Sequence, residues 1–518
     1  MKDRKIWFNI LLILFVAGVI IFPHLASLPL FDPDEPVYAE TALEMIQSQD
    51  FISPRIYGEF WYDKPPMYYW LVAGAFKMFG VGEFAARFPS ALLAVIGVVV
   101  VYLSGRKLFN DRVGLLSALI LTTSLEYFYL SNAAVTDMTL TFFLTVALLS
   151  FLHRRYYMFY GWTALAVVTK GPIGIVLCGA IVGIYLVLTG NLGLLKRMKL
   201  FRGTVLFAVI ALPWYLVMYY YHGMPFVDTF LGFHNVTRFL QPEHSSGVIW
   251  YYYIPVLILG FFPWTPFMVQ AYCAALREKG HNRKHGIFLA IWTSVVFLFF
   301  TLSQTKLVSY ILPMYPPLAM LVGWYFDKVW REKDYRALKW FTGSLTVLAI
   351  VLEMGLLCSG KEVTTQLLLP VQVLAILFVV VLALVWWMSY RQNFRGAFCI
   401  NIVGMFAFIT LLMTQIFPAV IPVFSAKGVV REFQQQYDGE SPVYVAAFYR
   451  PSFIFYSGLS SSEIKLPDTL AIELDKTIGK EYFLVKKKDY DKLPAALQNK
   501  VRVLLTQEDK ILLVREID

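Results

Sequence analysis

The sequence predicts an α-helical membrane protein that crosses the bilayer many times and carries a small α/β domain at its C-terminal end. Of its 518 residues, 58% are hydrophobic and only 15% are charged, whereas soluble proteins have about 25% charged residues. Apolar runs of about 17–25 residues, the length that crosses a bilayer, recur along the chain. The last hundred residues differ, because they are charged and contain short β-like runs such as SPVYVAAF, EYFLVKK and VRVLLTQ.

The apolar runs predict about thirteen transmembrane helices. The fifth run is short, and prolines interrupt the tenth. The approximate ranges are 6–22, 86–105, 113–131, 138–152, 157–169, 171–190, 204–221, 251–272, 286–302, 307–326, 340–358, 366–388 and 397–417.

Basic residues cluster at every second junction between these runs, beginning with Lys2, Arg4 and Lys5. Such loops stay in the cytoplasm, so the N-terminus is predicted to be cytoplasmic. The first run resembles a signal peptide, but no small-x-small cleavage site follows it, which favours a retained helix. An odd number of spans then places the C-terminus outside.

These patterns predict two domains. Residues 1–417 form a transmembrane domain with an extracytoplasmic interfacial loop at 24–85. Residues 418–518 form a small extracytoplasmic α/β domain, whose strands are separated by turn signals such as Asp438-Gly439.

Several classes of function are disfavoured. The net charge of +10 suggests nucleic acid, but the basic residues lie in short loops between apolar runs, the pattern that sets membrane orientation. Four cysteines without CxxC spacing indicate neither a disulfide framework nor a thiolate metal site. The sequence lacks a P-loop, the motif that would indicate ATP-driven transport. It also lacks a GxSxG elbow, the motif that would indicate a serine hydrolase.

The loop at 24–85 concentrates charge beside the bilayer, where carboxylates are costly and tend to be functional. Its residues 34–46 have helical apolar spacing, with Asp34 as a plausible N-cap, and 66–80 form a second apolar-aromatic segment. Both are expected to be helices in the membrane interface. The charged residues that stand out in the loop are Asp32, Asp34, Glu35, Glu40, Asp63 and Lys64.

Polar residues from other junctions fall on the same predicted face, although they are far apart in sequence. They are Asp137, Lys170, His234, Asn235, Arg238, Glu243, His244, Lys306 and Tyr310. This convergence suggests a site at the extracytoplasmic membrane surface.

The acids and lysines suggest complementary roles. Asp34 or Asp137 could be a general base, because partial desolvation raises the pKa of a carboxylate; helix capping is the alternative for Asp34. Lys64 and Lys306 could hold a phosphate as point charges, and snorkelling is the alternative for Lys306. Lys170 could equally be a turn lysine or a ligand.

The histidines suggest a metal only weakly. A site that combines His234 or His244 with Asp63 or Glu35 is conceivable, but the spacing matches no strong metal signature. Histidines of an aromatic surface loop are the alternative.

An activated sugar donor on this face would be lipid-linked, because nucleotides are not available there. A polyprenyl phosphate fits, since its tail lies in the bilayer, its phosphate meets the lysines and its sugar meets the acids.

The segments FDPDEPVYAETALEMIQSQDFISP and YDKPPMYYW resemble the opening loop of the bacterial lipid A aminoarabinose transferases and the related protein O-mannosyltransferases, which have the GT-C fold. The likeness continues through VVTKGP, HNVTRFLQPEHSSGVIWYYYIP and TKLVSYILPMYPPLAML, and covers residues 1–330 in order. It implies an inverting transfer of a sugar from a polyprenyl phosphate.

The resemblance also implies roles for single residues. Asp34 matches the acid proposed as the family's catalytic base, and Asp137 matches a second acid. The matches near the lipid phosphate are Lys64, Lys306 and Tyr310, and those near a metal of some members are Asp63 and His244.

Two positions depart from the aminoarabinose transferases. Val37 replaces their usual arginine before Tyr38, and Asp63 replaces their usual glutamate before Lys64. The identity of the sugar therefore stays open.

We therefore predict a GT-C-like glycosyltransferase of the bacterial inner membrane. It moves a sugar from undecaprenyl phosphate to an extracytoplasmic acceptor such as lipid A, another envelope glycolipid or a protein. A lipid-linked oligosaccharide ligase or polymerase and a flippase are the alternatives. A divalent metal is the one cofactor left open, and no nucleic acid partner is expected. The assigned residues are Asp34, Asp137 and Glu35 as catalytic, Lys64, Lys306, Tyr310 and Tyr38 at the donor phosphate, and Asp63 and His244 at a metal.

Overall fold

Long apolar helices make up most of the chain. The computed structural model describes residues 2–241, 249–280, 282–363, 367–464, 468–475 and 479–515. Within these ranges seven helices are long and apolar enough to cross a membrane, or nine if each of two bent helix pairs is one span. The prediction of a multi-pass helical membrane protein is confirmed, and the count of thirteen spans stays a prediction.

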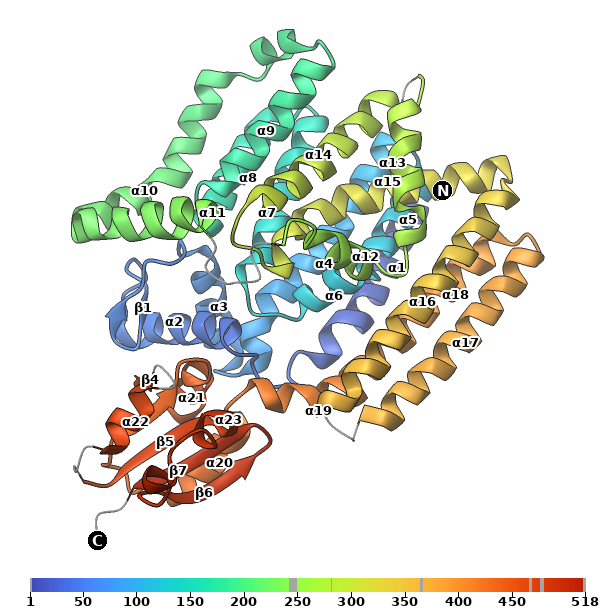
Figure 1. Cartoon of the computed structure of the whole chain (residues 1–518). Coiled ribbons are helices and arrows are strands. Elements are labelled where there is room, and N and C mark those ends of the chain that lie inside the picture. The colour runs from blue at the N-terminus through green and yellow to red at the C-terminus, as the bar shows by residue number, and fades with distance from the viewer. Residues whose placement is uncertain are drawn as a thin grey trace.

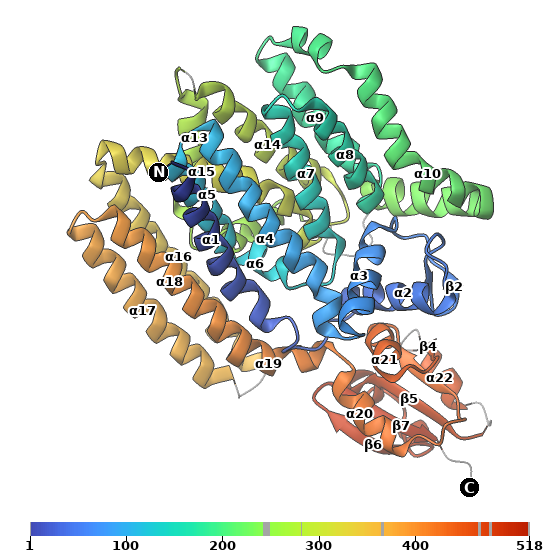
Figure 2. The same ribbon diagram turned by 180° about the vertical axis from the view of Figure 1, so that it is seen from behind.

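The helices pack side by side into a bundle, with α1 along α4 and with α16, α17 and α18 as a peripheral layer (Figures 1 and 2). The apolar helices of the bundle are α1 (Lys2–Ile21), α4 (Glu83–Leu108), α5 (Asp111–Thr122), α6 (Leu125–Ser131), α7 (Thr136–Leu152), α8 (Tyr156–Lys170), α9 (Ile173–Leu188), α10 (Leu200–Val227), α12 (Tyr253–Gly260), α13 (Met268–Arg277), α14 (Arg283–Leu302), α15 (Tyr315–Glu332), α16 (Tyr335–Val363), α17 (Leu368–Tyr390), α18 (Phe394–Leu411) and α19 (Phe417–Val420).

Two predicted single spans are bent. The run at 113–131 forms α5 and α6 at 65° to each other, and the run at 251–272 forms α12 and a second helical stretch at 116°. Pro263 lies in the second break and Pro266 at the start of the stretch that follows it, where proline removes backbone donors from the helix ladder. In the tenth run, Pro313 lies in a 3₁₀ segment, η6 (Val308–Met314), and Pro316 and Pro317 lie in the first turn of α15.

The connection between the predicted spans 204–221 and 251–272 is largely helical where it is described. α10 bends at Gly223, which has φ +61°, and continues into the π-helix η3 (Asp228–Thr237) and the short α11 (Arg238–Leu240). This connection is therefore helical on both sides of a kink, because Gly223 has non-helical backbone angles and separates two helices there. The segment after the bend runs beside the first loop (Figure 1).

Basic residues of distant segments share one end of the bundle. Lys5 and Arg106 each lie 3.0 Å from a carboxylate oxygen of Asp111. Arg112 and Arg331 approach the Asp327 carboxylate at 3.1 Å and 2.9 Å. The N-terminus lies toward this end, whereas α2 and the C-terminal strands lie at the opposite one (Figures 1 and 2).

The first loop contains the two helices expected there, α2 (Asp34–Ser48) and α3 (Met67–Phe79), joined through a hairpin of β1 (Arg55–Ile56) and β2 (Glu59–Phe60). The N-cap expectation for Asp34 is wrong: Pro33 is the N-cap, and Asp34 is the first helical residue. The buried rings of Tyr38, Tyr68 and Tyr69 pack between the helices, with the Tyr38 centroid 5.6 Å and 5.9 Å from the other two.

The C-terminal region forms a five-stranded sheet in the order β4-β3-β5-β7-β6, in which β3 is parallel to both neighbours and β7 antiparallel to both of its own. The three β-like runs named above become β3, β5 and β6. The elements of this region are α20 (Lys427–Gln436), β3 (Val443–Ala446), α21 (Arg450–Ser457), β4 (Ser462–Ile464), α22 (Asp468–Asp475), β5 (Glu481–Lys486), α23 (Lys487–Tyr490), α24 (Ala495–Gln498), β6 (Arg502–Gln507) and β7 (Lys510–Arg515).

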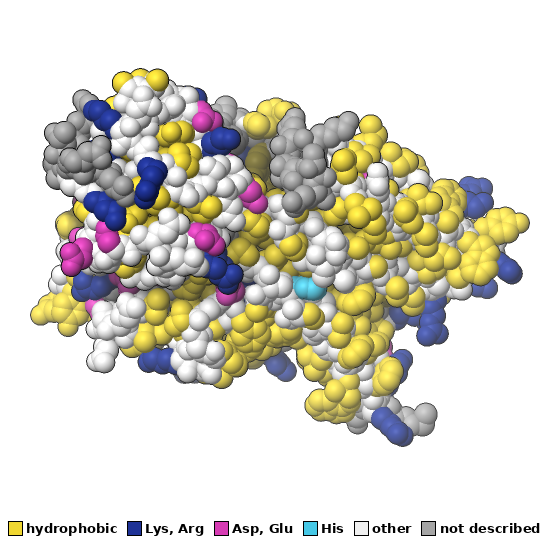
Figure 3. Space-filling model, turned by 90° about the horizontal axis from the view of Figure 1, so that it is seen from below, with side chains coloured by type: hydrophobic (Ala, Val, Ile, Leu, Met, Phe, Trp, Pro, Cys, Tyr) yellow, Lys and Arg dark blue, Asp and Glu magenta, His cyan; other side chains and the backbone are white. Residues whose placement is uncertain are grey.

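The sheet region packs on the first loop, with α21 against α2 (Figure 1). Seen from below, acidic and basic side chains mix over the part of the surface that this region forms, whereas hydrophobic side chains dominate the remainder (Figure 3). The membrane bundle and the polar region thus meet at the first loop.

Candidate active site

Charged side chains from four separate segments meet at the end of the bundle where the first loop lies. Asp34 begins α2, Asp63 and Lys64 precede α3, Asp137 lies in the first turn of α7, and Lys170 ends α8. The charges of the other four all act on the Asp34 carboxyl. The structure therefore brings together residues that the sequence placed on one face.

Lys170 and Asp137 form a buried ion pair, with 2.6 Å between Nζ and Oδ1. The helices α7 and α8 are neighbours joined by a short turn, so the start of one lies beside the end of the other. The helix dipole stabilises an acid in the first turn and a cation in the last, which favours both residues where they are. The Lys170 Nζ also lies 4.4 Å from the centroid of the Tyr310 ring.

Gly171 lets the chain turn directly after Lys170. Its φ is +80°, a conformation that L side chains rarely adopt. A Cβ atom there would lie 2.9 Å from Phe230 Cζ and 3.4 Å from Asn235 Oδ1, both in η3. The glycine thus allows the end of α8 to approach η3 closely.

Asp63 lies among three basic side chains. Its Oδ1 is 2.8 Å from Lys64 Nζ, 2.7 Å from His234 Nδ1 and 3.3 Å from an Arg238 nitrogen. Burial acts to raise the pKa of Asp63, but Lys64, His234 and Arg238 outweigh it and hold that pKa below its ordinary value. Burial lowers the pKa of Lys64, and Asp63 opposes this. Asp63 is therefore ionised and links the first loop to η3.

Asp34 is different from the other acids, because its side chain is exposed and makes no hydrogen bond or ion pair with any residue that the structure describes. Protein atoms nevertheless lie close enough to the carboxyl group to desolvate it. Burial, followed by the charges of Asp137 and Asp63, raises the pKa of Asp34. A carboxylate that is accessible, unpaired and raised in pKa is suited to accept a proton.

Glu35 has all four of its acceptor positions occupied. Oε1 accepts from Arg87 Nε at 2.9 Å and from the Ala134 amide at 2.7 Å, and Oε2 accepts from Arg87 at 2.6 Å and from the Phe31 amide at 2.8 Å. A carboxylate has about four such positions. These contacts support a positioning role for Glu35, and its catalytic role stays a prediction.

The other residues assigned to the donor phosphate lie at different depths. Tyr310, in η6, lines a cavity beside Lys170. Lys306 is buried, and its Nζ donates to the Ser303 carbonyl at 2.5 Å. Tyr38 is buried in the aromatic contact between α2 and α3.

That cavity has a volume of about 600 Å³. Its polar wall includes Asp63, Lys64, Lys170 and Arg238, and its apolar wall comes from α9, η3 and α14. A space with basic groups on one part of its wall and hydrocarbon on another fits an amphipathic ligand with an anionic head group.

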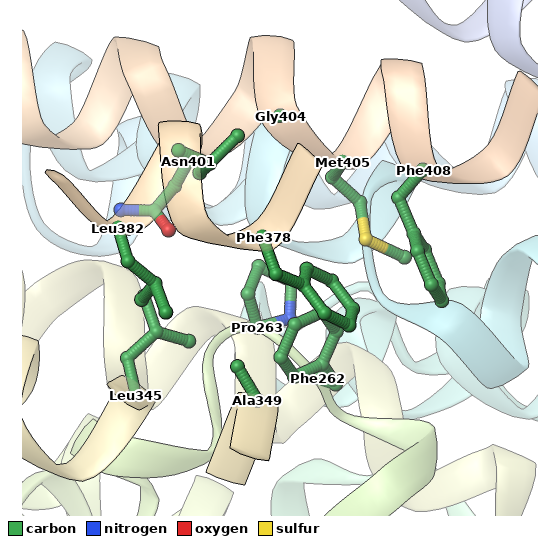
Figure 4. A pocket seen from close by; sticks show the side chains of 11 residues that line it. Phe262, Pro263, Leu345, Ala349, Phe378, Leu382, Asn401, Gly404, Met405 and Phe408 are labelled. Atoms are coloured by element: carbon green, nitrogen blue, oxygen red, sulfur yellow. The ribbon is translucent and has the colours of Figure 1, made fainter. Parts of the chain in front are cut away.

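A second hollow, inside the bundle, has a different character. Figure 4 shows it between Phe262, Phe378 and Phe408, with Asn401 as the polar side chain at its edge. Its volume is about 20 Å³, which is room for about one water molecule. It is a packing gap between membrane helices.

The residues around Asp63 do not fit a metal ion. Lys64 and Arg238 would repel a cation and would have to give up Asp63 to it. In the described part of the chain no group of three or more His, Cys, Asp or Glu side chains could hold a metal. His244 and Glu243 lie outside the described residues.

Comparisons with known proteins agree with this arrangement. Residues 63–216 match the family described as dolichyl-phosphate-mannose-protein mannosyltransferase. Two uncharacterized proteins of Aquifex aeolicus are 34% identical over 325 residues and 33% identical over 311; each match takes in 60% of this chain, and 63% and 70% of the relatives. The chain belongs to the same family as the second of these proteins.

The chain is also similar to a protein with a descriptive name, the undecaprenyl phosphate-alpha-4-amino-4-deoxy-L-arabinose arabinosyl transferase of Pectobacterium atrosepticum. It is 28% identical over 370 residues, which are 65% of each chain. The chain thus spans about two thirds of the length of these curated relatives.

Two solved structures have the same fold. ArnT from Cupriavidus metallidurans, bound to undecaprenyl phosphate, superposes with a TM-score of 0.83 at 22% identity over 97% of both chains. The oligosaccharyltransferase AglB from Archaeoglobus fulgidus has a TM-score of 0.56 at 14% identity, over 94% of this chain and 71% of its own. The fold is GT-C, as the sequence resemblance implied.

Three residues of the site were not among those assigned from sequence: Lys170, His234 and Arg238. All three lie on the same predicted face as the assigned residues. His234 and Arg238 are four residues apart, which puts them on one side of a helix.

Proposed function

We propose that this chain is an inverting glycosyltransferase that moves a sugar from undecaprenyl phosphate to an acceptor at the extracytoplasmic face of the bacterial inner membrane. The observation that carries the proposal is an accessible Asp34, without a partner among the described residues, together with a basic, partly apolar cavity. The names of the relatives, which include an undecaprenyl phosphate sugar as donor, support the same substrate class.

In this proposal the donor phosphate binds at the basic wall of the cavity. Lys64, Lys170 and Arg238 each already contact a carboxylate in a partly buried place. A bound phosphate would share these cations, and the polyprenyl tail would lie along the apolar wall. Preorganised cations stabilise the negative charge that grows on a leaving phosphate.

Asp34 would act on the acceptor. It takes the proton from an acceptor hydroxyl or amine while that atom bonds to the anomeric carbon. The bond between the anomeric carbon and the phosphate oxygen breaks, and undecaprenyl phosphate leaves with the electron pair. A single displacement of this kind inverts the anomeric centre. Asp137 would hold Lys170 in place.

The same geometry supports one orientation of the chain in the membrane. The basic end of the bundle would lie in the cytoplasm and the end with Asp34 outside, in agreement with the distribution of cations between loops. The N-terminus would then be cytoplasmic and the sheet region periplasmic. The acceptor would be lipid A, another envelope glycolipid or a protein.

A transfer assay tests the proposal. The purified chain in detergent is supplied with undecaprenyl phosphate carrying radiolabelled 4-amino-4-deoxy-L-arabinose and with lipid A. We expect transfer by wild type and by Glu59→Gln, an exposed acid of the same loop, and its loss in Asp34→Asn. Transfer without a sealed bilayer separates an enzyme from a flippase. Equal transfer by Asp34→Asn and wild type would contradict the proposal.

A further inference from the structure

A second polar cavity lies between the first loop and the C-terminal sheet region. It has a volume of about 400 Å³, within the range of small-molecule sites, and shares no lining residue with the cavity at Lys170. One wall is the face of α2 from Glu40 to Ser48. The opposite wall is α21 and the turn that follows it, with Ser461 at its end.

Each wall carries one buried polar group without a hydrogen-bond partner among the described residues. Glu40 is 7% exposed and Ser461 is 9% exposed, and neither Glu40 Oε2 nor Ser461 Oγ has a hydrogen-bond partner among the described residues. Native proteins pair nearly all such atoms, so two in one cavity, from two parts of the chain, indicate a ligand that supplies the missing bonds. Burial, with the Glu44 charge, raises the pKa of Glu40 to about 7.

The rest of the wall is held in place. Glu44 accepts hydrogen bonds from the amides of Tyr57 at 2.5 Å and Gly58 at 3.1 Å. The Arg450 guanidinium lies 4.4 Å from the centre of the Tyr57 ring and donates to the Ser461 carbonyl at 3.1 Å. The cavity is therefore built jointly by the hairpin of the first loop and the sheet region.

The charges select the kind of ligand. The carboxylates of Glu40 and Glu44 would repel a small anion. The guanidinium groups of Arg55 and Arg450 would repel a small cation. A neutral molecule rich in hydroxyl groups satisfies both, because each hydroxyl can donate to a carboxylate and accept from a guanidinium. Carbohydrate has this chemistry.

The position relates the cavity to the proposed reaction. Asp34 is the first residue of the helix whose later turns form the cavity wall. At about 1.5 Å per residue, Glu40 lies roughly 9 Å along the axis from Asp34 and Ser48 roughly 21 Å. A short oligosaccharide bridges such a distance.

We propose that this cavity binds a sugar unit of a glycan-bearing acceptor, remote from the group that is glycosylated. That the bound sugar belongs to an acceptor rests on the proposed function. The binding of carbohydrate in the cavity does not depend on it. The sheet region thereby becomes part of the acceptor site.

The experiment measures binding and kinetics separately. A soluble, neutral N-acetylglucosamine disaccharide is titrated calorimetrically into the full chain in detergent, and transfer is measured at varied lipid A and varied donor. The variants are Glu40→Gln and Ser461→Ala, each of which removes one hydrogen-bonding group, with Glu440→Gln, an exposed acid of the sheet region, as the matched control.

We expect both variants to weaken disaccharide binding and to raise the KM for lipid A about five- to tenfold, the loss of about one hydrogen bond. The kcat and the KM for the donor should stay within about twofold of wild type, and Glu440→Gln should be unchanged. Gln47→Ala, on the same wall, serves if either variant melts early.

Unchanged disaccharide binding in all variants, or none in wild type, would overturn the inference and make the cavity a water-filled gap. Failure of transfer by wild type, with disaccharide binding intact and sensitive to Glu40→Gln, would refute the proposed function and leave the carbohydrate site standing.

Discussion

Ser452 donates two hydrogen bonds to Asp32, one from its backbone amide at 3.0 Å and one from its hydroxyl group. Asp32 lies two residues before Asp34, and its own amide donates to the Phe424 carbonyl at 2.9 Å. The Leu30 amide donates to the Tyr456 hydroxyl at 2.7 Å. The sheet region is thus fastened to the segment that begins α2.

This contact predicts a pH dependence of stability. Burial raises the pKa of Asp32 to about 8, although Ser452 and Lys510 oppose the shift. Because the folded chain binds this proton more tightly than the unfolded chain, the contribution to stability is full below about pH 4 and is lost as the pH rises to about 8. We expect the melting temperature in detergent to fall over this window, and the fall to be smaller in Asp32→Asn. An identical slope in Asp32→Asn would contradict the assignment.

Asp34→Asn should lower kcat about 10²- to 10⁴-fold, the usual contribution of a general base, with little change in the KM for the donor. The wild-type rate should climb with pH until Asp34 is ionised, at a pKa above the ordinary 3.8. Steady-state kinetics between pH 4 and 8 measures both. A wild-type rate that is flat across acidic pH would argue against Asp34 as the base.

Glu35→Gln should destabilise the chain. It leaves the buried Arg87 without its charge partner, and removing one partner of a buried pair costs about 3–5 kcal/mol. Thermal unfolding in detergent measures the loss, with Glu59→Gln as the exposed control. A variant that is as stable as wild type but inactive would support the catalytic role of Glu35 instead.

Lys170→Met should raise the KM for the donor about tenfold or more, because a cation at the phosphate is lost and Asp137 is left unpaired. Lys170→Arg should keep part of the affinity. Lys196→Met, in the turn at the far end of α9, is the control. Initial rates at varied donor concentration decide the matter, and equal KM values for Lys170→Met and Lys196→Met would remove Lys170 from the donor site.

Much of the fold follows from local sequence. A span needs about twenty apolar residues, and a strand shows itself by its β-rich run and flanking turns, so the helices of the bundle and β3, β5 and β6 were predictable. The π-helix η3 was not, since it depends on how the chain after Gly223 packs against α8 and the first loop. Pro33 likewise took the N-cap that the sequence suggested for Asp34.

The sequence by itself determined that acids and basic residues gather at one end of a membrane bundle, because hydrophobic length and loop charge are read along the chain. Only the tertiary structure decided how each acid is used. Glu35 accepts hydrogen bonds from Arg87, 52 residues away in the sequence, and from the Ala134 amide, 99 residues away. Asp137 accepts one from Lys170, 33 residues away in the sequence. Asp34, next to Glu35 in the chain, finds no such partner among the described residues. Hydrogen bonds depend on distances in space, and neighbouring residues on a helix point in different directions.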